Sequence, residues 1–309
     1  MFGRKLKFAD IYSAGTVDVE VLNLQIQKRL KRRKILDLTL RYTILTLGAF
    51  IMIYPMLWLF GASFKTNAEI FTSIWFVPPR FDFSVYAQAW KTGTQYTLGH
   101  YFLNTFRFVL PRVIFTVISS VIVAYGFARF NFPLKKFLFG LMISTMFLPW
   151  VVRIIPMYLF WRNLGLLDTF VPLYAHTIFA NEAFFVFMLI QFFRTLPKEL
   201  DEAAVIDGCN SFQVLIKILL PNIKPAVISV GLFQFMWSMN DFLGPLIYIS
   251  SVEKYPIQIA LRMAIDATAG VEWNVIIAMS LIALMPSIII FFAAQKYFVR
   301  GVATTGLKG

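Results

Sequence analysis

The segment LPKELDEAAVIDGCNSFQVLIKILLPNIKP, residues 196–225, interrupts an otherwise apolar half of the chain. It places three acids, Glu199, Asp201 and Glu202, between two apolar runs at 170–193 and 224–249. Each of these runs is long enough to cross about 30 Å of hydrocarbon as a helix. The pattern therefore predicts a polar, folded loop between two membrane-spanning helices.

The composition supports a membrane protein. The 309 residues are 59% hydrophobic and only 15% charged, with a mean hydropathy of +0.70, whereas soluble domains contain about 25% charged residues. The apolar excess falls into six runs, at 37–62, 101–127, 137–160, 170–193, 224–249 and 275–298. Backbone groups in lipid must be satisfied within each segment, and no run alternates as the strands of a barrel do. We therefore expect an all-α polytopic protein with six transmembrane helices; the alternative is a soluble protein with unusually apolar core helices.

Basic residues predict the orientation of the chain. The densest basic run, QKRLKRRK at 27–34, lies an even number of crossings from the 194–224 loop. The same side carries Arg129, Lys135, Lys136, Lys296, Arg300 and Lys308. By the positive-inside rule this side is cytoplasmic. We expect a cytoplasmic segment at 1–36, with an amphipathic surface helix at 16–34, a transmembrane domain at 37–298 and a cytoplasmic tail at 299–309.

The net charge of +13 is explained by this topology and by contact with lipid headgroups, so we expect no nucleic-acid partner. The chain has no phosphate-binding G-x-x-x-x-G-K-[ST] motif and none of the common hydrolase motifs. Its histidines, His100 and His176, lie far apart, and the single Cys209 excludes an internal disulfide and a four-ligand zinc site. We therefore expect no catalytic residue, metal or cofactor in this chain. A membrane enzyme or scaffold is the alternative from another functional class.

The opening loop predicts two short helices. Pro197 suits a first helical position, and the acids that follow it favour a helix N-terminus. Gly208 ends the first helix and Pro221 closes the second. One face of the first helix, which is flat and carries small residues, consists by helical spacing of Leu200, Ala203, Ala204 and Asp207. The second has an apolar face of Phe212, Leu215, Ile216 and Leu219. The first helix, with its flat face, could enter a groove in another protein. The alternative is that it is a surface helix without a partner.

Within this loop, EAAVIDGCNSFQVLIKILLP (202–221) resembles the signature of ABC importer permeases. The matching residues are Glu202, Ala203, Ala204, Asp207, Gly208, Leu220 and Pro221, and Cys209 stands where the family usually has alanine. Other segments are similar to the carbohydrate subgroup, specifically the maltose-type second permease. They are NTF…AYGFAR (104–129), LPWVVRIIPMY (148–158), NLGLLDT (163–169), NDFLGPLIY (240–248) and KYFVRGVATTGLKG (296–309).

The resemblance implies a type I ABC importer permease in a bacterial or archaeal cytoplasmic membrane. It also implies a second homologous permease, two ATPase subunits that bind ATP and Mg, and an extracytoplasmic solute-binding protein that delivers a sugar. Residues 199–208 would form the coupling helix: Glu202 would anchor it by charge, Ala203 and Ala204 would permit close approach to the ATPase, and Gly208 would allow the turn. The tail GVATTGLKG resembles tails that reach the ATPase interface, or is a frayed end. The alternative solute is a polyol or glycerol phosphate.

Polar residues inside spans are candidates for the substrate pathway. They are Asn181, Glu182, Gln234, Asn240 and Asp241, of which the last two could instead hydrogen-bond neighbouring helices. Aromatic candidates are Trp150, Tyr158, Trp161 and Trp237, each of which could pack rather than stack on a sugar. Pro149 and Pro156 should kink the third span, so that it can line a cavity.

Four arginines near the predicted outer ends of spans two and three run against the positive-inside rule: Arg107, Arg112, Arg153 and Arg162. One hypothesis is that their guanidinium groups attract an acidic saccharide, such as a uronate-containing oligosaccharide. The alternative is that they form ion pairs with Glu182 or with outer-loop acids.

Overall fold

The computed structural model describes residues 15–91, 95–266 and 272–306, and this described part of the chain is helical, without β-strands. Four segments are long and apolar enough to span a membrane: Ile26–Ala62, Leu98–Arg129, Val171–Thr195 and Trp273–Lys296. Two bent pairs add further candidates, Lys135–Thr145 with Trp150–Asn163 and Ser211–Asn222 with Lys224–Met239. Counting each pair as one span gives six, which matches the six predicted runs.

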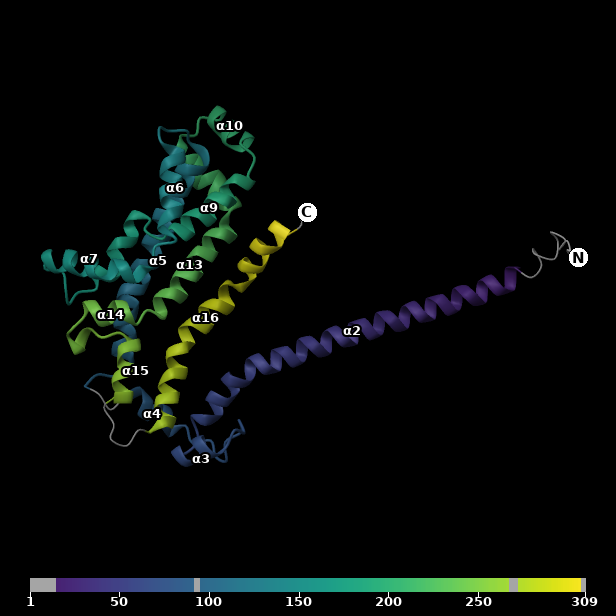
Figure 1. Cartoon of the computed structure of the whole chain (residues 1–309), viewed down its shortest axis with the longest axis horizontal. Helices are drawn as coiled ribbons and strands as arrows, with labels where there is room; N and C mark the ends of the chain where they lie inside the picture. The colour runs from purple at the N-terminus through teal and green to yellow at the C-terminus, as the bar shows by residue number, and fades with distance from the viewer. Residues whose placement is uncertain (1–14, 92–94, 267–271, 307–309) are drawn as a thin grey trace, which may run out of the picture. The chain divides into compact units, whose positions relative to one another are not determined.

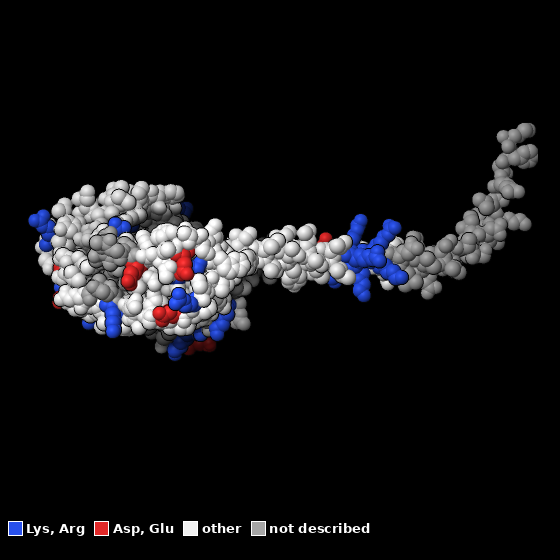
Figure 2. All heavy atoms as spheres, turned by 90° about the horizontal axis from the view of Figure 1, so that it is seen from below, with Lys and Arg blue, Asp and Glu red and all other residues white. Residues whose placement is uncertain are grey.

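The chain divides into two compact units, of which the first contains residues 1–61 and 74–77. Its helix α2 (Gly15–Ala62) continues across residues 34–37, in a stretch from 16 to 47 that contains neither glycine nor proline; Pro55 lies inside the helix further on. The predicted surface helix at 16–34 and the first predicted span at 37–62 therefore belong to one helix. Figure 2 shows the lysine and arginine side chains of residues 27–34 gathered in one band on this helix.

Residues 74–77 pack closely on the end of α2. The Tyr54 hydroxyl donates a 2.7 Å hydrogen bond to the Ile74 carbonyl, and the rings of Tyr54 and Phe76 meet edge to face with centroids 6.3 Å apart. A Cβ atom added at Gly61 would lie 1.6 Å from the Phe76 carbonyl oxygen. Only glycine allows these two backbone segments to approach so closely.

Replacing Gly61 with alanine should therefore lower the thermal stability of the purified protein, by about 1–3 kcal/mol of overpacking. Gly48 on the same helix has no neighbouring atom within 4 Å of the added methyl group. We expect Gly48→Ala to be neutral or to stabilise by up to about 1 kcal/mol, because alanine favours helix. Thermal unfolding in detergent would measure both variants, and equal midpoints would contradict the close contact at Gly61.

The second unit, residues 62–73 and 78–309, is a helical bundle around α5 (Leu98–Arg129). Helix α5 packs against α9 (Ala183–Thr195) and α13 (Lys224–Met239), and α16 (Trp273–Gly306) packs against α13 (Figure 1). Thr116, Ser120 and Ala124 are buried at four-residue spacing on α5. Such small side chains let membrane helices approach closely.

The two ends of this bundle differ. Helix α10 (Glu199–Ile206) lies at one end, which we call the loop end. Helices α3 (Asn67–Thr72), α4 (Ser84–Lys91) and α15 (Ile257–Asp266) lie at the other, which we call the cap end (Figure 1). Helix α16 continues to Gly306, so most of the predicted tail 299–309 is helical, while residues 307–309 lie outside the described part.

Three predicted spans are interrupted. A 98° bend separates α6 (Lys135–Thr145) from α7 (Trp150–Asn163), with Pro149 directly before α7 and Pro156 inside it. The fourth span consists of α8 (Val171–Tyr174), the 3-10 helix η1 (Ala175–Phe179) and α9, with a break at residues 180–182. The fifth breaks at residues 240–242, before α14 (Leu243–Tyr248). Irregular backbone at membrane depth is tolerated where it is buried in protein or lines a cavity.

Candidate functional site

The interrupted helices surround a cavity of about 400 Å³. Its polar lining residues are Arg112, Arg153, His176, Asn181, Glu182 and Asp241. Trp150, Trp237 and Tyr248 supply aromatic surface. The lining residues come from α5, α7, α8, η1, α13, α14 and the two helix breaks. The size is in the range of pockets that hold a small ligand.

One pair of opposite charges in the cavity is already joined. Arg112 Nη1 lies 2.6 Å from Asp241 Oδ2, and the two side chains are 14% and 23% exposed. The other oxygen of Asp241, Oδ1, accepts a 2.9 Å hydrogen bond from the Gly244 backbone N–H. Asp241 therefore links α5 to the start of α14. The Asp241 side chain therefore holds two helices together and also lines the cavity.

A second pair of charges is available to a ligand. Arg153 donates a 3.2 Å hydrogen bond to the Asn181 side-chain oxygen, and among the described residues it forms no ion pair. The Glu182 carboxylate, just before α9, has no hydrogen-bonding side-chain partner in the described ranges. Among the described lining residues, the cavity therefore offers a guanidinium and a carboxylate that form no ion pair, next to an arginine whose charge Asp241 offsets.

The aromatic lining has exposed faces. Trp150 and Trp237 are 48% and 47% exposed. The Trp237 ring packs against the ring of Phe185, with the two centroids 4.8 Å apart. Trp161 is buried at 7% exposure, and neither Trp161 nor Tyr158 lines the cavity, so packing is the better explanation for Trp161.

The structure brings together five of the predicted pathway residues, namely Arg153, Asn181, Glu182, Trp237 and Asp241. It does not place Gln234 or Asn240 in the cavity. Gln234 is fully buried and donates a 3.0 Å hydrogen bond to Ser238 Oγ, and Asn240 donates a 2.7 Å hydrogen bond to the Met236 carbonyl. The Gln234 side chain is turned into the bundle interior, and the Asn240 side chain is bonded to its own helix.

The four arginines also separate. Arg112 and Arg153 line the cavity, whereas Arg107 and Arg162 are exposed outside it, and Arg107 donates a hydrogen bond to the Asn104 side chain. Ion pairing explains Arg112, although the partner is Asp241 rather than Glu182. Opposite charges in the second and fifth spans were the sequence signal for this pair, because buried charges in membranes tend to pair.

At the loop end, α10 begins at Glu199 and is followed by Gly208 with a φ of 85°. Pro197 precedes the helix rather than starting it, which corrects our prediction. The second helix contains a π-helical stretch, Val214–Leu219, and continues through Pro221 to Asn222. The helix therefore ends one residue after Pro221, close to the predicted end, and Asn222 Nδ2 donates a 2.6 Å hydrogen bond to the Ile218 carbonyl.

The exposed face of the loop also differs from the predicted one. Ala204 is only 5% exposed and packs in a core cluster with Leu215 and Leu219. Its small side chain therefore allows close approach to this chain's own helices. Glu202, Ala203 and Asp207 are exposed, as are Val205, Ile206 and Phe212, at 60%, 86% and 68%. Apolar side chains this exposed at a folded loop are typical of a protein–protein contact.

The loop is fastened to α5. Arg129 Nε lies 2.7 Å from Asp201 Oδ2, with side-chain exposures of 7% and 21%. Arg129 also donates a 3.1 Å hydrogen bond to the Leu196 carbonyl, and the Tyr125 hydroxyl donates one of 3.0 Å to the Ser211 carbonyl. These contacts join α10 and the π-containing helix to the end of α5. Because Arg112 is on the same helix, α5 connects the loop to the cavity.

Comparison with known proteins agrees with this architecture. Residues 116–304 match the family described as "Binding-protein-dependent transport system inner membrane component". The chain is 29% identical to the diacetylchitobiose uptake system permease protein NgcG of Streptomyces coelicolor, over 82% of this chain and 84% of that protein. It is 30% identical to the sn-glycerol-3-phosphate transport system permease protein UgpE of Brucella melitensis, over 85% and 95%.

A solved structure is similar in fold as well as in sequence. It is a chain of a bacterial ABC transporter involved in the import of the acidic polysaccharide alginate. The TM-score is 0.72 at 25% sequence identity, and the match covers 84% of this chain and 95% of that chain.

Proposed function

Because the chain belongs to the family of binding-protein-dependent transport system inner membrane components, we propose that it is the permease subunit of an ATP-driven carbohydrate importer. It would pair with a second permease in the cytoplasmic membrane and receive its solute from an extracytoplasmic binding protein. Two ATPase subunits would bind ATP and Mg, and this chain would have no catalytic site of its own. The loop end and both termini would face the cytoplasm, in keeping with the basic residues there.

The observation that most strongly supports this proposal is the cavity at the helix breaks. A carbohydrate needs hydrogen-bond donors and acceptors for its hydroxyl groups and an apolar surface for the faces of its ring. Arg153, Asn181 and Glu182 offer the first, and the exposed faces of Trp150 and Trp237 offer the second. Interrupted helices at membrane depth are also where transporters commonly bind their solutes.

The contacts of α5 suggest how a movement driven by ATP hydrolysis in the ATPase subunits would be transmitted to the cavity. The exposed Val205, Ile206 and Phe212 would dock on an ATPase, and closure of the ATPases would move α10. The Arg129–Asp201 pair would pass that movement to α5, which carries Arg112 into the cavity wall. The cavity would then open alternately to the two sides of the membrane.

An acidic solute is the second candidate, and the unpaired guanidinium of Arg153 favours it. A uronate carboxylate or the phosphate of a glycerol phosphate would accept charge-assisted hydrogen bonds from this group. The names of the UgpE relative and of the alginate transporter both specify an acidic solute, whereas NgcG is named for a neutral one. The Glu182 carboxylate repels an anion. Whether the cavity takes an acidic or a neutral solute therefore depends on whether the solute contacts Arg153 or Glu182.

Arg153→Ala tests this choice. If the solute is acidic, uptake of an alginate oligosaccharide by the reconstituted transporter should fall about ten-fold, the effect of losing one charge-assisted hydrogen bond. Uptake of diacetylchitobiose, where it occurs, should change less. Arg162→Ala is the matched control, because Arg162 is an exposed arginine on the same helix outside the cavity. Unchanged uptake of the anion in Arg153→Ala would remove this role from Arg153.

The importer itself is tested by purification. A tagged chain should bring down a second permease and an ATPase, and their ATP hydrolysis should respond to the loaded binding protein. A chain that transports solute alone, without either partner, would refute the proposal.

A further inference from the structure

Two sequence motifs, NLGLLDT (163–169) and NDFLGPLIY (240–248), lie outside the 196–225 loop for which ATPase docking is proposed. The structure brings them together around α14, the six-residue helix whose Gly244, Ile247 and Tyr248 form part of the cavity wall. Each motif supplies one aspartate that contacts an end of this helix. Asp241 contacts its start, and Asp168 contacts its end. A helix this short has little stability of its own, so its position depends on contacts with the rest of the protein.

At the start of α14, the Asp241 carboxylate joins the Gly244 N–H to the Arg112 guanidinium, as described above. A Cβ atom at Gly244 would lie 2.8 Å from Asp241 Oδ2 and 3.0 Å from Oδ1. The absence of a side chain at this position is therefore what allows the carboxylate to lie over the helix N-terminus. This explains why aspartate and glycine occur three residues apart in the motif.

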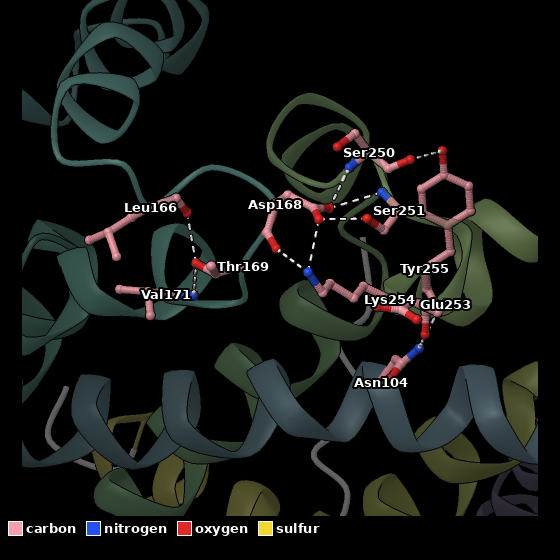
Figure 3. A network of polar contacts seen from close by, with 10 residues as sticks. All are labelled: Asn104, Leu166, Asp168, Thr169, Val171, Ser250, Ser251, Glu253, Lys254 and Tyr255. Atoms are coloured by element: carbon pink, nitrogen blue, oxygen red, sulfur yellow. Dashed lines mark hydrogen bonds and ion pairs between the residues drawn. The ribbon is translucent and has the colours of Figure 1, made fainter.

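At the end of α14, Asp168 makes a denser set of contacts (Figure 3). Its N–H donates a 2.8 Å hydrogen bond to the Tyr248 carbonyl. Its Oδ1 accepts hydrogen bonds from the backbone N–H groups of Ser250 and Ser251, at 3.0 and 2.9 Å. Its Oδ2 accepts from Ser251 Oγ at 2.5 Å and from Lys254 Nζ at 2.8 Å. The φ of Asp168 is 57°, so the backbone adopts a left-handed conformation to place these groups.

Asp168 remains ionised in this setting. Partial burial of the carboxyl opposes ionisation, but the hydrogen bonds from Lys254, Ser251 and Ser250 outweigh it and hold the pKa of Asp168 well below its usual range. The contacts made by the carboxylate are therefore present throughout the neutral and mildly acidic range.

The segment that Asp168 holds is also tied to α5. Asn104 Nδ2 donates hydrogen bonds to the carbonyls of Glu253 and Tyr255, at 2.7 and 3.1 Å (Figure 3). Thr105 Oγ1 accepts a 3.0 Å hydrogen bond from the Ile257 N–H. Helix α14 is therefore fixed to α5 on two sides, through Arg112 at its start and through residues 250–257 after its end.

We propose that Asp168 is a positioning residue for the transported solute, because it holds the end of α14 and thereby sets the cavity wall formed by Ile247 and Tyr248. Asp168 is not among the residues that line the cavity, so it acts through Tyr248 and the segment that follows. This inference rests on the proposed function, since it concerns the solute that the cavity takes. It assigns to the NLGLLDT motif a role in affinity rather than in energy coupling.

The test uses the complete transporter reconstituted with its binding protein, with diacetylchitobiose and an alginate oligosaccharide as probes. In Asp168→Asn, the probe concentration that gives half-maximal uptake should rise about five- to ten-fold, while the maximal rate changes less than about two-fold. Asp168→Glu should recover part of the affinity. Asp82→Asn is the control, because Asp82 also accepts a backbone N–H hydrogen bond, from Ser84, but is not in the cavity lining. An unchanged half-saturating concentration in Asp168→Asn, or an equal rise in Asp82→Asn, would overturn the proposal.

A second measurement does not depend on the solute. Backbone hydrogen exchange over residues 243–251 of the assembled complex should be at least about ten-fold faster in Asp168→Asn than in the wild type. Equal exchange would overturn the holding role of Asp168 even if neither probe is transported. A wild-type complex that takes up neither probe would count against the proposed carbohydrate function instead. If Asp168→Asn does not assemble, Ser251→Ala removes a single donor and should raise the half-saturating concentration about two- to three-fold; no change there would overturn the proposal.

Discussion

Replacing Gly208 with proline should reduce uptake at least ten-fold while the protein still inserts and assembles, because this turn fixes the direction in which α10 presents its exposed residues. Gly208 has a φ of 85°, and proline is held near −65°. The turn would have to reorganise, and Val205 and Ile206 would no longer meet an ATPase in the same geometry. Glu202→Lys should act in the same direction, since it reverses an exposed charge on the same helix.

Uptake and ATP hydrolysis have to be measured on the same preparations, because loss of coupling predicts continued hydrolysis without transport. Gly208→Asn is one control, since asparagine tolerates the left-handed region better than other residues with side chains. Glu199→Lys is the other, as it changes an exposed acid in the first turn of the same helix outside the signature. Normal uptake in both Gly208→Pro and Glu202→Lys would refute the coupling role of the loop.

Removing the guanidinium of Arg129 should have the second large effect. Arg129→Ala leaves the carboxylate of Asp201, at 21% exposure, without its ion-pair partner. Breaking a largely buried pair in this way costs about 3–5 kcal/mol at most, since partial exposure reduces the loss. We expect α10 to detach from α5, so that ATP hydrolysis is no longer transmitted to the cavity and uptake falls at least ten-fold.

A double-mutant cycle measures this link directly. The exchange Arg129→Asp with Asp201→Arg should restore part of the uptake lost in either single variant, because it re-forms the pair in the opposite sense. Arg194→Ala is the control: Arg194 lies over the Phe139 ring, 5.7 Å from its centroid, and is exposed. Strictly additive losses in the double variant would show that Arg129 and Asp201 act independently.

The six spans could be predicted because each is specified by its own residues. A segment that enters hydrocarbon has to satisfy its backbone internally and be about 20 residues long, whatever its neighbours do. The bends could be anticipated only where a local cause exists, as with Pro149. The break at residues 180–182 has no such marker, and Ala180 there has a φ of 52°.

The candidate site was predictable in part. Polar residues in spans are costly, so Arg153, Asn181, Glu182 and Asp241 were reasonable candidates for a cavity. Gln234 satisfies the same criterion, yet it is fully buried and hydrogen-bonded to Ser238. Which face of α13 turns toward the cavity depends on how α5 and α16 pack against it, and a single sequence does not contain that information.

The sequence by itself determined the helical class, the number of candidate spans and the place of the polar loop at 196–225, because the bilayer acts on each segment separately. Only the tertiary structure decided that Arg112 meets Asp241, that Ala204 turns inward and that Asp168 holds residues 250–254. These contacts join residues far apart in the chain, or depend on the rotation of one helix against another. They are set by the packing of the bundle as a whole, which no single segment specifies.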